Sequence, residues 1–295
     1  MTVNFSIIVP TYNHANFLKN AIDSVINQTY TNWELIIVDN FSEDDTFEIV
    51  NSFKDKRIAY YKFKNNGVIA ASRNYGIKIS SGNWIAFLDS DDIWYSNKLS
   101  VLSEKILENS DCQVFCSNEY KVFHQTNKKQ ILKVGPYEKN FYKYMLVNGN
   151  KLSTSATAIS KKIVDKGLVF DESEGLITVE DYDLWLRIAK NNYKFYFINV
   201  PLGEYLVHNN NLSQNILKHL KRTEFLLKDH VFNQQSFTSN KVFMWSFVKA
   251  RISLSKFQQL VIQKNYNKAL LFFVLLFLNN PIAILYYLIL HFKKQ

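Results

Sequence analysis

Glycine and proline are scarce in this sequence, with 8 and 4 residues among 295. Their scarcity excludes collagen-like and low-complexity chains and argues against long disordered linkers. Only two cysteines occur, Cys112 and Cys116, and both lie in an apolar stretch. We therefore expect buried free thiols in a reducing compartment rather than a disulfide or a zinc site. The first residues lack the basic segment and long apolar core of a signal peptide, so a cytoplasmic protein is expected.

Acidic residues are almost absent from the end of the chain. From Lys218 to Gln295 there are twelve Lys or Arg, and the only acids are Glu224 and Asp229. The first 217 residues carry a net charge of about −1. A near-neutral body with a basic, apolar end favours an anionic membrane surface over nucleic acid as the partner, and a solvated basic face is the alternative.

Hydrophobic residues make up 47% of the chain, and in its first part they form four short runs, at 5–10, 33–39, 58–63 and 84–89. Their length and β-branched content predict buried strands, with amphipathic helical stretches between them. A helix around 97–109 and a strand at 112–118 should follow. This alternation predicts an α/β fold with a mostly parallel sheet and helices on both faces.

Polar residues follow three of the four runs, at Pro10, Thr11, Tyr12, Asn13, Asp39, Asp89, Ser90 and Asp91. All of them fall at the carboxyl ends of the predicted strands. In open α/β sheets this edge is where ligands bind. The sequence therefore predicts the functional site at this edge.

Three closely spaced aspartates, Asp89, Asp91 and Asp92, would repel one another and raise each other's pKa unless a cation joins them. In an extended segment, side chains two residues apart project from the same face, so the first two can converge on one point. A site of carboxylate oxygens suits Mg²⁺ or Mn²⁺ bound to a diphosphate. Capping of the following helix by Asp92 or Ser96 is the alternative.

Five motifs resemble, in order, those of the family 2 glycosyltransferases, which are inverting enzymes with the GT-A fold. They are VPTYN (9–13), VDNFSEDDT (38–46), NNGVIAASRNYGI (65–77), LDSDD (88–92) and VEDYDLWLRIA (179–189). The resemblance runs across about residues 5–213. Where the family often has Asp-Asp-Gly-Ser, this chain has Asp39-Asn40-Phe41-Ser42.

The resemblance implies a donor nucleotide site at Pro10, Thr11, Tyr12, Asn13, Asp39, Arg73, Asp89 and Ser90. Asp39 would accept a hydrogen bond from the base, usually uracil, and Arg73 would lie near the donor diphosphate. From the residues alone, a turn position for Asp39 and a surface position for Arg73 stay open.

The resemblance also implies a divalent metal, Mn²⁺ or Mg²⁺, held by Asp91 together with His208. A lone histidine is as readily a packing or surface residue, so both interpretations stay open for His208. The arginine that relatives usually carry two residues earlier is Leu206 here.

The aspartate of the family's Glu-Asp pair, here Asp181, would be the general base that deprotonates the acceptor hydroxyl. Glu180, Asp92 and Trp94 would contact the acceptor or support the site. Acids in a first helical turn also offset the helix macrodipole, and Thr178 with Asp181 resembles a capping box, so a structural role is the alternative here.

We predict a catalytic domain at 1–217, with a nucleotide-binding half (1–118) and an acceptor half (119–217). A basic helical extension (218–268) and an apolar membrane-docking segment (269–295) follow. Asn279-Asn280-Pro281 splits the apolar stretch 269–291. Two short helices in the membrane interface are therefore favoured over a kinked transmembrane helix or a soluble hairpin.

These features predict an inverting, metal-dependent hexosyltransferase of surface polysaccharide synthesis, such as O-antigen or capsule. It would move a hexose from a UDP-sugar to a lipid-linked or lipopolysaccharide glycan, at the inner face of the cell membrane. A dTDP-sugar donor and a non-catalytic nucleotide-sugar-binding protein stay open. A haloacid dehalogenase-type phosphatase is disfavoured because its Asp-x-Asp-x-Thr motif would follow the first strand.

Overall fold

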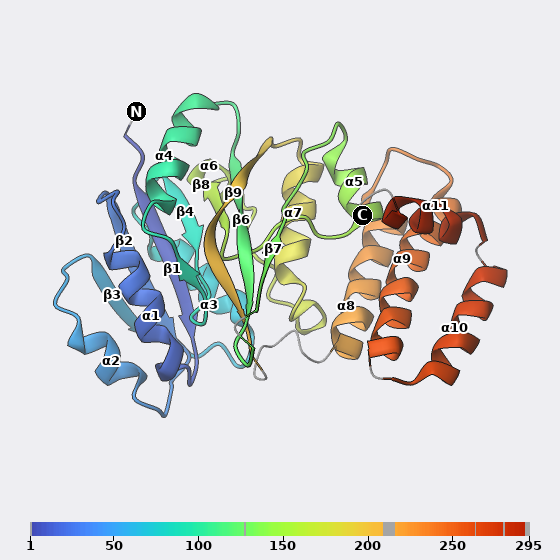
Figure 1. Ribbon diagram of the computed structural model, residues 1–295. Helices are drawn as coiled ribbons and strands as arrows, with labels where there is room; N and C mark the ends of the chain where they lie inside the picture. The colour runs from blue at the N-terminus through green and yellow to red at the C-terminus, as the bar shows by residue number, and fades with distance from the viewer. Residues whose placement is uncertain (1, 127, 209–215, 263, 280, 293–295) are drawn as a thin grey trace. The chain divides into compact units, whose positions relative to one another are not determined.

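The computed structural model describes residues 2–126, 128–208, 216–262, 264–279 and 281–292 (Figure 1). Its contacts divide the chain into two compact units, which we describe separately. The sheet unit comprises Met1–Tyr137 and Lys151–Asn211, and the helical unit comprises Glu138–Asn150 and Leu212–Gln295. Residues 138–150, which the sequence assigned to the acceptor half, thus group with the C-terminal helices.

Among the described residues, the sheet unit contains one sheet of nine strands. The strands are β1 (Phe5–Thr11), β2 (Trp33–Asp39), β3 (Ile58–Lys62), β4 (Trp84–Phe87), β5 (Ile93–Trp94), β6 (Val114–Phe123), β7 (Lys128–Leu132), β8 (Thr157–Ser160) and β9 (Phe195–Val207). Their order is β3-β2-β1-β4-β8-β6-β9-β5, with β7 paired to β6. The first four strands are the four predicted from the apolar runs.

Parallel pairing sets the edge that carries the site. Strand β1 pairs with β2 from Phe5 opposite Trp33 to Thr11 opposite Asp39, and it pairs with β4 in the same direction. The carboxyl ends of β1 and β2 are therefore level. Beyond β4 the sheet becomes mixed, because β8 is antiparallel to both β4 and β6, whereas β9 runs parallel to β6.

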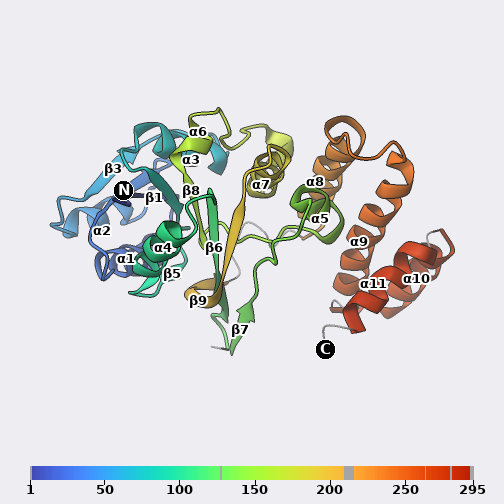
Figure 2. The same cartoon turned by 90° about the horizontal axis from the view of Figure 1, so that it is seen from above.

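Helices cover both faces of the sheet, as predicted (Figure 2). In the sheet unit they are α1 (Ala15–Ile26), α2 (Thr46–Ser52), α3 (Ile69–Ile79), α4 (Lys98–Glu108), α6 (Lys161–Val164), a 3₁₀ turn (Glu174–Leu176) and α7 (Glu180–Lys190). Helix α3 packs closely on β1, where a Cβ atom on Gly76 would lie 2.6 Å from Ile8 Cγ2. Glycine at this position therefore allows the helix to approach the sheet.

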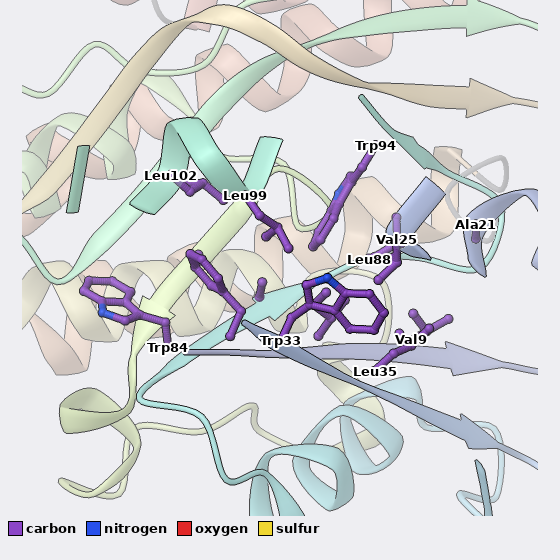
Figure 3. Packing of buried hydrophobic residues seen from close by; sticks show 14 of the residues in the cluster. Val9, Ala21, Val25, Trp33, Leu35, Trp84, Leu88, Trp94, Leu99 and Leu102 are labelled. Carbon is purple, nitrogen blue, oxygen red and sulfur yellow. The ribbon is translucent and has the colours of Figure 1, made fainter. Parts of the chain in front are cut away.

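The main core lies between the sheet and helices α1 and α4, which cover one of its faces (Figure 3). Alternate residues of β1 and β2 point into it, including Val9 and Leu35, and they meet Val25 of α1 and Leu99 of α4. This is the period-two pattern of a buried strand meeting the apolar stripe of a helix. Burial of these side chains supplies the main driving force that fixes the carboxyl edge of the sheet.

The helical unit contains α5 (Phe141–Asn148), α8 (Ile216–Asp229), a π-helical turn (His230–Gln234), α9 (Lys241–Ile262), α10 (Tyr266–Asn279) and α11 (Pro281–Phe292). Two hydrogen bonds tie its parts together: the Tyr142 hydroxyl and His230 Nδ1 are 2.9 Å apart, and the Tyr287 hydroxyl donates to the Val147 carbonyl at 2.7 Å. A small core of Ala250, Ala283 and Ile284 joins α9 to α11.

The apolar segment forms two short helices, as predicted, with Pro281 at the first position of α11, where a missing N–H costs nothing. Asn280, at the break, lies outside the described residues. None of the helices in the described part of the chain is both long and apolar enough to cross a membrane.

Candidate active site

The aspartates that follow β4 lie in a tight turn, not in the extended segment that the sequence suggested. The backbone N–H of Asp92 donates to the carbonyl of Asp89 at 3.0 Å, which closes the turn around Ser90 and Asp91. The three carboxylates therefore separate into different surroundings. Each one has its own partners, and these explain how the chain tolerates three adjacent acids.

Arg73, on α3, is the cation beside Asp89. Its Nη2 donates to Asp89 Oδ1 at 2.7 Å and its Nη1 donates to Glu180 Oε1 at 2.8 Å. Burial alone would lower the pKa of the guanidinium, but the charges of Asp89 and Glu180 raise it above its usual value, so Arg73 stays charged. Arg73 therefore joins the turn after β4 to the first turn of α7. Among the described residues, both of its terminal nitrogens bind carboxylates, and its role at a donor diphosphate stays a prediction.

His208 stands beside Asp91, as the prediction of a shared metal site requires. The two side chains meet at 2.9 Å, between His208 Nε2 and Asp91 Oδ2. The imidazole stacks on the Phe17 ring, with centroids 4.6 Å apart, which fixes its orientation. Burial and the charge of Asp89 raise the pKa of Asp91, and the bond to His208 partly offsets this.

The donor set formed by Asp91 and His208 fits a divalent ion in part. A carboxylate oxygen and an imidazole nitrogen suit Mn²⁺, which fills its other positions with water or phosphate oxygens. In the described part of the chain, no group of three or more His, Cys, Asp or Glu could hold a metal ion by itself. A metal here would need the substrate to complete its coordination.

Asp181 lies in the first turn of α7, next to Glu180. Thr154 Oγ1 donates to Asp181 Oδ2 at 3.3 Å. Burial raises the pKa of Asp181 to about 6, and the neighbouring charge of Glu180 contributes. A carboxyl group with this pKa is a stronger base than an ordinary aspartate and is still mostly ionised at neutral pH.

The first turn of α7 does not form the capping box that its sequence resembles. The N-cap residue is Val179, without a side-chain cap, and Thr178 has a left-handed backbone with φ of 76°. Glu180 is bound to Arg73, and Asp183 forms an ion pair with Arg187 at 2.6 Å. The acids of this turn are thus held by specific partners.

Asp92 and Trp94 are buried, with 1% and 2% of their surfaces exposed. Asp92 accepts hydrogen bonds from Ser155 Oγ at 2.5 Å and from the Leu206 N–H at 2.9 Å, so it joins the segment before β8, and β9, to the turn instead of capping α4. The Trp94 indole donates to the Ser155 carbonyl at 2.7 Å and lies in the core (Figure 3). The sequence predicted that these two residues contact the acceptor or support the site. Their burial agrees with a supporting role, and it excludes stacking of Trp94 on an acceptor sugar.

Asp39, at the end of β2, is fully buried. It accepts from the N–H and the hydroxyl of Ser42, the latter at 2.5 Å, and from the Tyr60 hydroxyl at 2.6 Å. These bonds match the turn role that the sequence left open. Contact between Asp39 and a nucleotide base stays a prediction, and it would require one of these donors to move.

The segment after β1 lies beside that turn. Pro10 and Thr11 complete β1, Tyr12 is 52% exposed, and Asn13 has a left-handed backbone. The structure therefore brings all the predicted donor residues to one edge of the sheet. Only Tyr12 among these four presents a large exposed side chain.

Two site residues escaped the sequence analysis. His14 Nδ1 lies 2.9 Å from Ser90 Oγ, and its only signal was its place directly after the VPTYN motif. Ser155 Oγ accepts from the Asp89 N–H at 3.0 Å as well as donating to Asp92. Nothing local marks Ser155, because its partners lie more than sixty residues away in the sequence.

The sequence model of glycosyl transferase family 2 matches residues 6–167. Among characterised proteins, the chain is similar to the Escherichia coli UDP-Glc:alpha-D-GlcNAc-diphosphoundecaprenol beta-1,3-glucosyltransferase WfgD. The two are 34% identical over 229 residues, which cover 77% of this chain and 87% of that protein.

Two solved structures share the fold. TarS from S. aureus, in complex with UDP-GlcNAc, has a TM-score of 0.62 at 18% identity, covering 84% of this chain and 72% of TarS. The mannosyltransferase PcManGT from Pyrobaculum calidifontis, in complex with GDP-Man and Mn²⁺, has a TM-score of 0.61 at 16% identity, covering 88% and 72%. The GT-A architecture predicted from the sequence is confirmed.

Proposed function

Because the chain belongs to glycosyltransferase family 2, we propose that it transfers a hexose from a UDP-sugar to a lipid-linked glycan, with inversion at the anomeric carbon. Family membership confirms the predicted enzyme class, a hexosyltransferase. The observation that carries the proposal is the position of Asp181. A carboxylate with a pKa of about 6 stands next to Glu180, which Arg73 joins to the turn after β4.

In this mechanism Asp181 accepts the proton of the acceptor hydroxyl. The hydroxyl oxygen bonds to the anomeric carbon while the bond from that carbon to the diphosphate breaks on the opposite face, so an α-linked donor gives a β linkage. Glu180 is paired with Arg73 and helps to raise the pKa of Asp181, which makes Asp181 a better base.

Asp91 and His208 are the residues that would hold a divalent metal. When bound, Mn²⁺ or Mg²⁺ would neutralise charge that develops on the leaving nucleoside diphosphate. Mn²⁺ in the PcManGT complex, which has the same fold, supports this part of the proposal. Asp89, held by Arg73, would stay beside this site without needing a metal to balance its charge.

The acceptor class rests on two observations. WfgD, by its name, acts on a sugar carried by diphosphoundecaprenol, a membrane lipid. The helical unit also exposes large apolar side chains on α10 and α11, among them Leu270, Leu271 and Ile282, each more than 60% exposed. Together with the nearby lysines, this composition suits peripheral binding to an anionic membrane, which we propose at the inner face.

The test is release of UDP from a panel of UDP-hexoses, with Mn²⁺, Mg²⁺ or EDTA, by the full chain in detergent. A synthetic polyprenyl diphosphate N-acetylhexosamine serves as the acceptor. We expect metal-dependent UDP release that requires the acceptor. Donor binding, measured by calorimetry with UDP, should occur without it.

The matched variants are Asp181→Asn and Asp165→Asn, the latter at an exposed position after α6. Asp181→Asn should bind UDP as the wild type does and lose turnover by about 10²–10⁴-fold. Asp165→Asn should change neither. Turnover retained by Asp181→Asn would reject the assigned base, and wild-type transfer from a dTDP-sugar alone would reject the assigned donor.

A further inference from the structure

The turn after β2 is fastened to the segment after β1 by three hydrogen bonds. The Asn40 N–H donates to the Thr11 carbonyl at 3.0 Å, the Asn13 N–H donates to Ser42 Oγ at 2.8 Å, and the Glu43 N–H donates to Asn13 Oδ1 at 2.8 Å. The two loops thus form one rigid piece at the donor edge. A side chain at the tip of one loop therefore has a fixed position relative to the other loop.

Phe41 is at the tip of this turn, and its conformation is unfavourable for its side chain. Its φ is 59°, in the left-handed region that glycine adopts freely and bulky residues avoid. Its side chain is also 52% exposed, so little burial offsets the strain. The fold alone would be better served by the glycine that the family often has here. A strained, exposed aromatic residue at a site edge indicates a functional reason.

The carboxylate of Asp39, two residues before Phe41, is already bound within the turn. Asp39 is fully buried and accepts hydrogen bonds from Ser42 and Tyr60. The exposed side chains of this piece include two aromatic rings, Phe41 and Tyr12, each 52% exposed, beside the polar Asn13 and Glu43. Exposed aromatic rings hold nucleotide bases by stacking on their faces, which every base presents.

We propose that the Phe41 ring stacks on the donor's nucleoside base, at the edge where Tyr12 presents a second exposed aromatic side chain. This assignment rests on the proposed function, since it presumes a nucleotide-sugar donor. Asp39 holds Ser42 and so fixes the turn that presents Phe41. The diphosphate is bound elsewhere, toward the turn after β4.

Phe41→Gly separates this role from a structural one, because it removes the ring and the strain together. We expect its melting temperature to equal or exceed that of the wild type, since glycine accepts a φ of 59°. Its dissociation constant for UDP, measured by calorimetry with Mn²⁺, should rise about tenfold, the loss typical of one base–aromatic stack. Its affinity for inorganic diphosphate with Mn²⁺ should not change.

Two variants control for the ring and for the strain. Phe41→Tyr keeps an aromatic face and should bind UDP within about twofold of the wild type. Asn192→Gly relieves a left-handed residue with φ of 59° just beyond α7, and it should leave UDP binding unchanged. A rise in melting temperature shared by both glycine variants, with weakened UDP binding in Phe41→Gly alone, is the expected pattern.

Three results would overturn the assignment. These are unchanged UDP affinity in Phe41→Gly, an equal loss of affinity for UDP and for inorganic diphosphate, or a fall in its melting temperature, which would give Phe41 a structural role. A wild-type chain that binds diphosphate with Mn²⁺ but no nucleoside diphosphate would instead reject the proposed donor. That outcome is distinct from a failure of Phe41 alone.

Discussion

The two acidic groups beside the turn after β4 are balanced by different kinds of cation. On one side, buried Arg73 holds Asp89 and Glu180 with a charge that is permanent at any working pH. On the other side, Asp91 meets the imidazole of His208, whose charge depends on protonation and whose nitrogen can also bind a metal. The first arrangement is suited to keep α7 and the turn assembled without substrate. The second can exchange its partner when substrate binds.

The largest effect, on folding stability, is expected from removing the permanent charge of Arg73. Arg73→Met leaves Asp89 and Glu180 without their cation, and removing one partner of a buried ion pair costs about 3–5 kcal/mol of folding stability. Urea denaturation measures this. Adding Glu180→Gln to Arg73→Met should recover part of the loss, because one uncompensated buried charge disappears. A double variant no more stable than Arg73→Met would contradict this account of the pair.

Removing the imidazole of His208 should affect the Mn²⁺ requirement more than folding stability. His208→Asn removes the proposed metal ligand and the stack on Phe17. We expect the Mn²⁺ concentration needed for half-maximal UDP release to rise at least tenfold. The stability loss should stay near 1–2 kcal/mol, below that of Arg73→Met. The idea fails if His208→Asn has an unchanged Mn²⁺ requirement in the same assay.

The pH profile of turnover sharpens the contrast, because Arg73 and the acids that it holds help to set the pKa of Asp181. Its pKa is raised to about 6, so the base is protonated and idle below that value. Turnover should therefore fall as the pH drops through about 6. The positive charge of Arg73 lowers the pKa of Asp181. In Arg73→Met the acidic limb of the profile, where turnover falls, should therefore move to higher pH. Initial rates from pH 5 to 8 test both statements, and an unmoved limb in Arg73→Met would contradict the second.

The smallest effect is expected from the bond between His14 and Ser90, which lies beside His208 but is part of neither cation pair. Ser90→Ala removes one hydrogen bond of 2.9 Å at a partly buried position, worth about 1 kcal/mol. Its melting temperature should fall by a few degrees. His14→Ala should cause a similar fall, and the two changes combined should be no worse than the larger one. Losses that add fully would show that the two side chains act independently.

Local patterns predicted the parallel half of the fold well. Apolar runs and stripes marked β1 to β4 and the helices between them, because these elements bury faces that their own sequence periodicity reveals. A strand at 112–118 was also predicted and is found as part of β6, but the pairing of β6 with β8 and β9 was not predicted. Their pairing depends on partners far away in the chain, which no local period records. The motifs likewise located the carboxyl edge, but not the mixed sheet that extends from it.

At the site, the sequence located the acids but not all of their partners. The resemblance placed Arg73 near a donor diphosphate, which stays a prediction, but no sequence spacing reveals that α3 also faces Glu180, 107 residues later. Trp94 was assigned to an acceptor cleft because aromatic residues beside a polar loop are typical of sugar sites. In the structure, the two-residue strand β5 pairs with β9, and Trp94 lies in the core. Long-range packing therefore decides which partners these two side chains contact.

The path of the chain through residues 138–150 has a practical consequence for anyone dividing this protein. The chain leaves the sheet unit after Tyr137, contributes α5 to the helical unit, and returns at Lys151 before leaving again after Asn211. A single stop codon near 211 would therefore not release a clean catalytic fragment. It would leave α5, with Phe141 and Met145 among its buried side chains, stripped of its neighbours in α9. A fragment made of the sheet unit alone would need two changes. The chain would have to end near residue 211, and a short loop would have to replace residues 138–150.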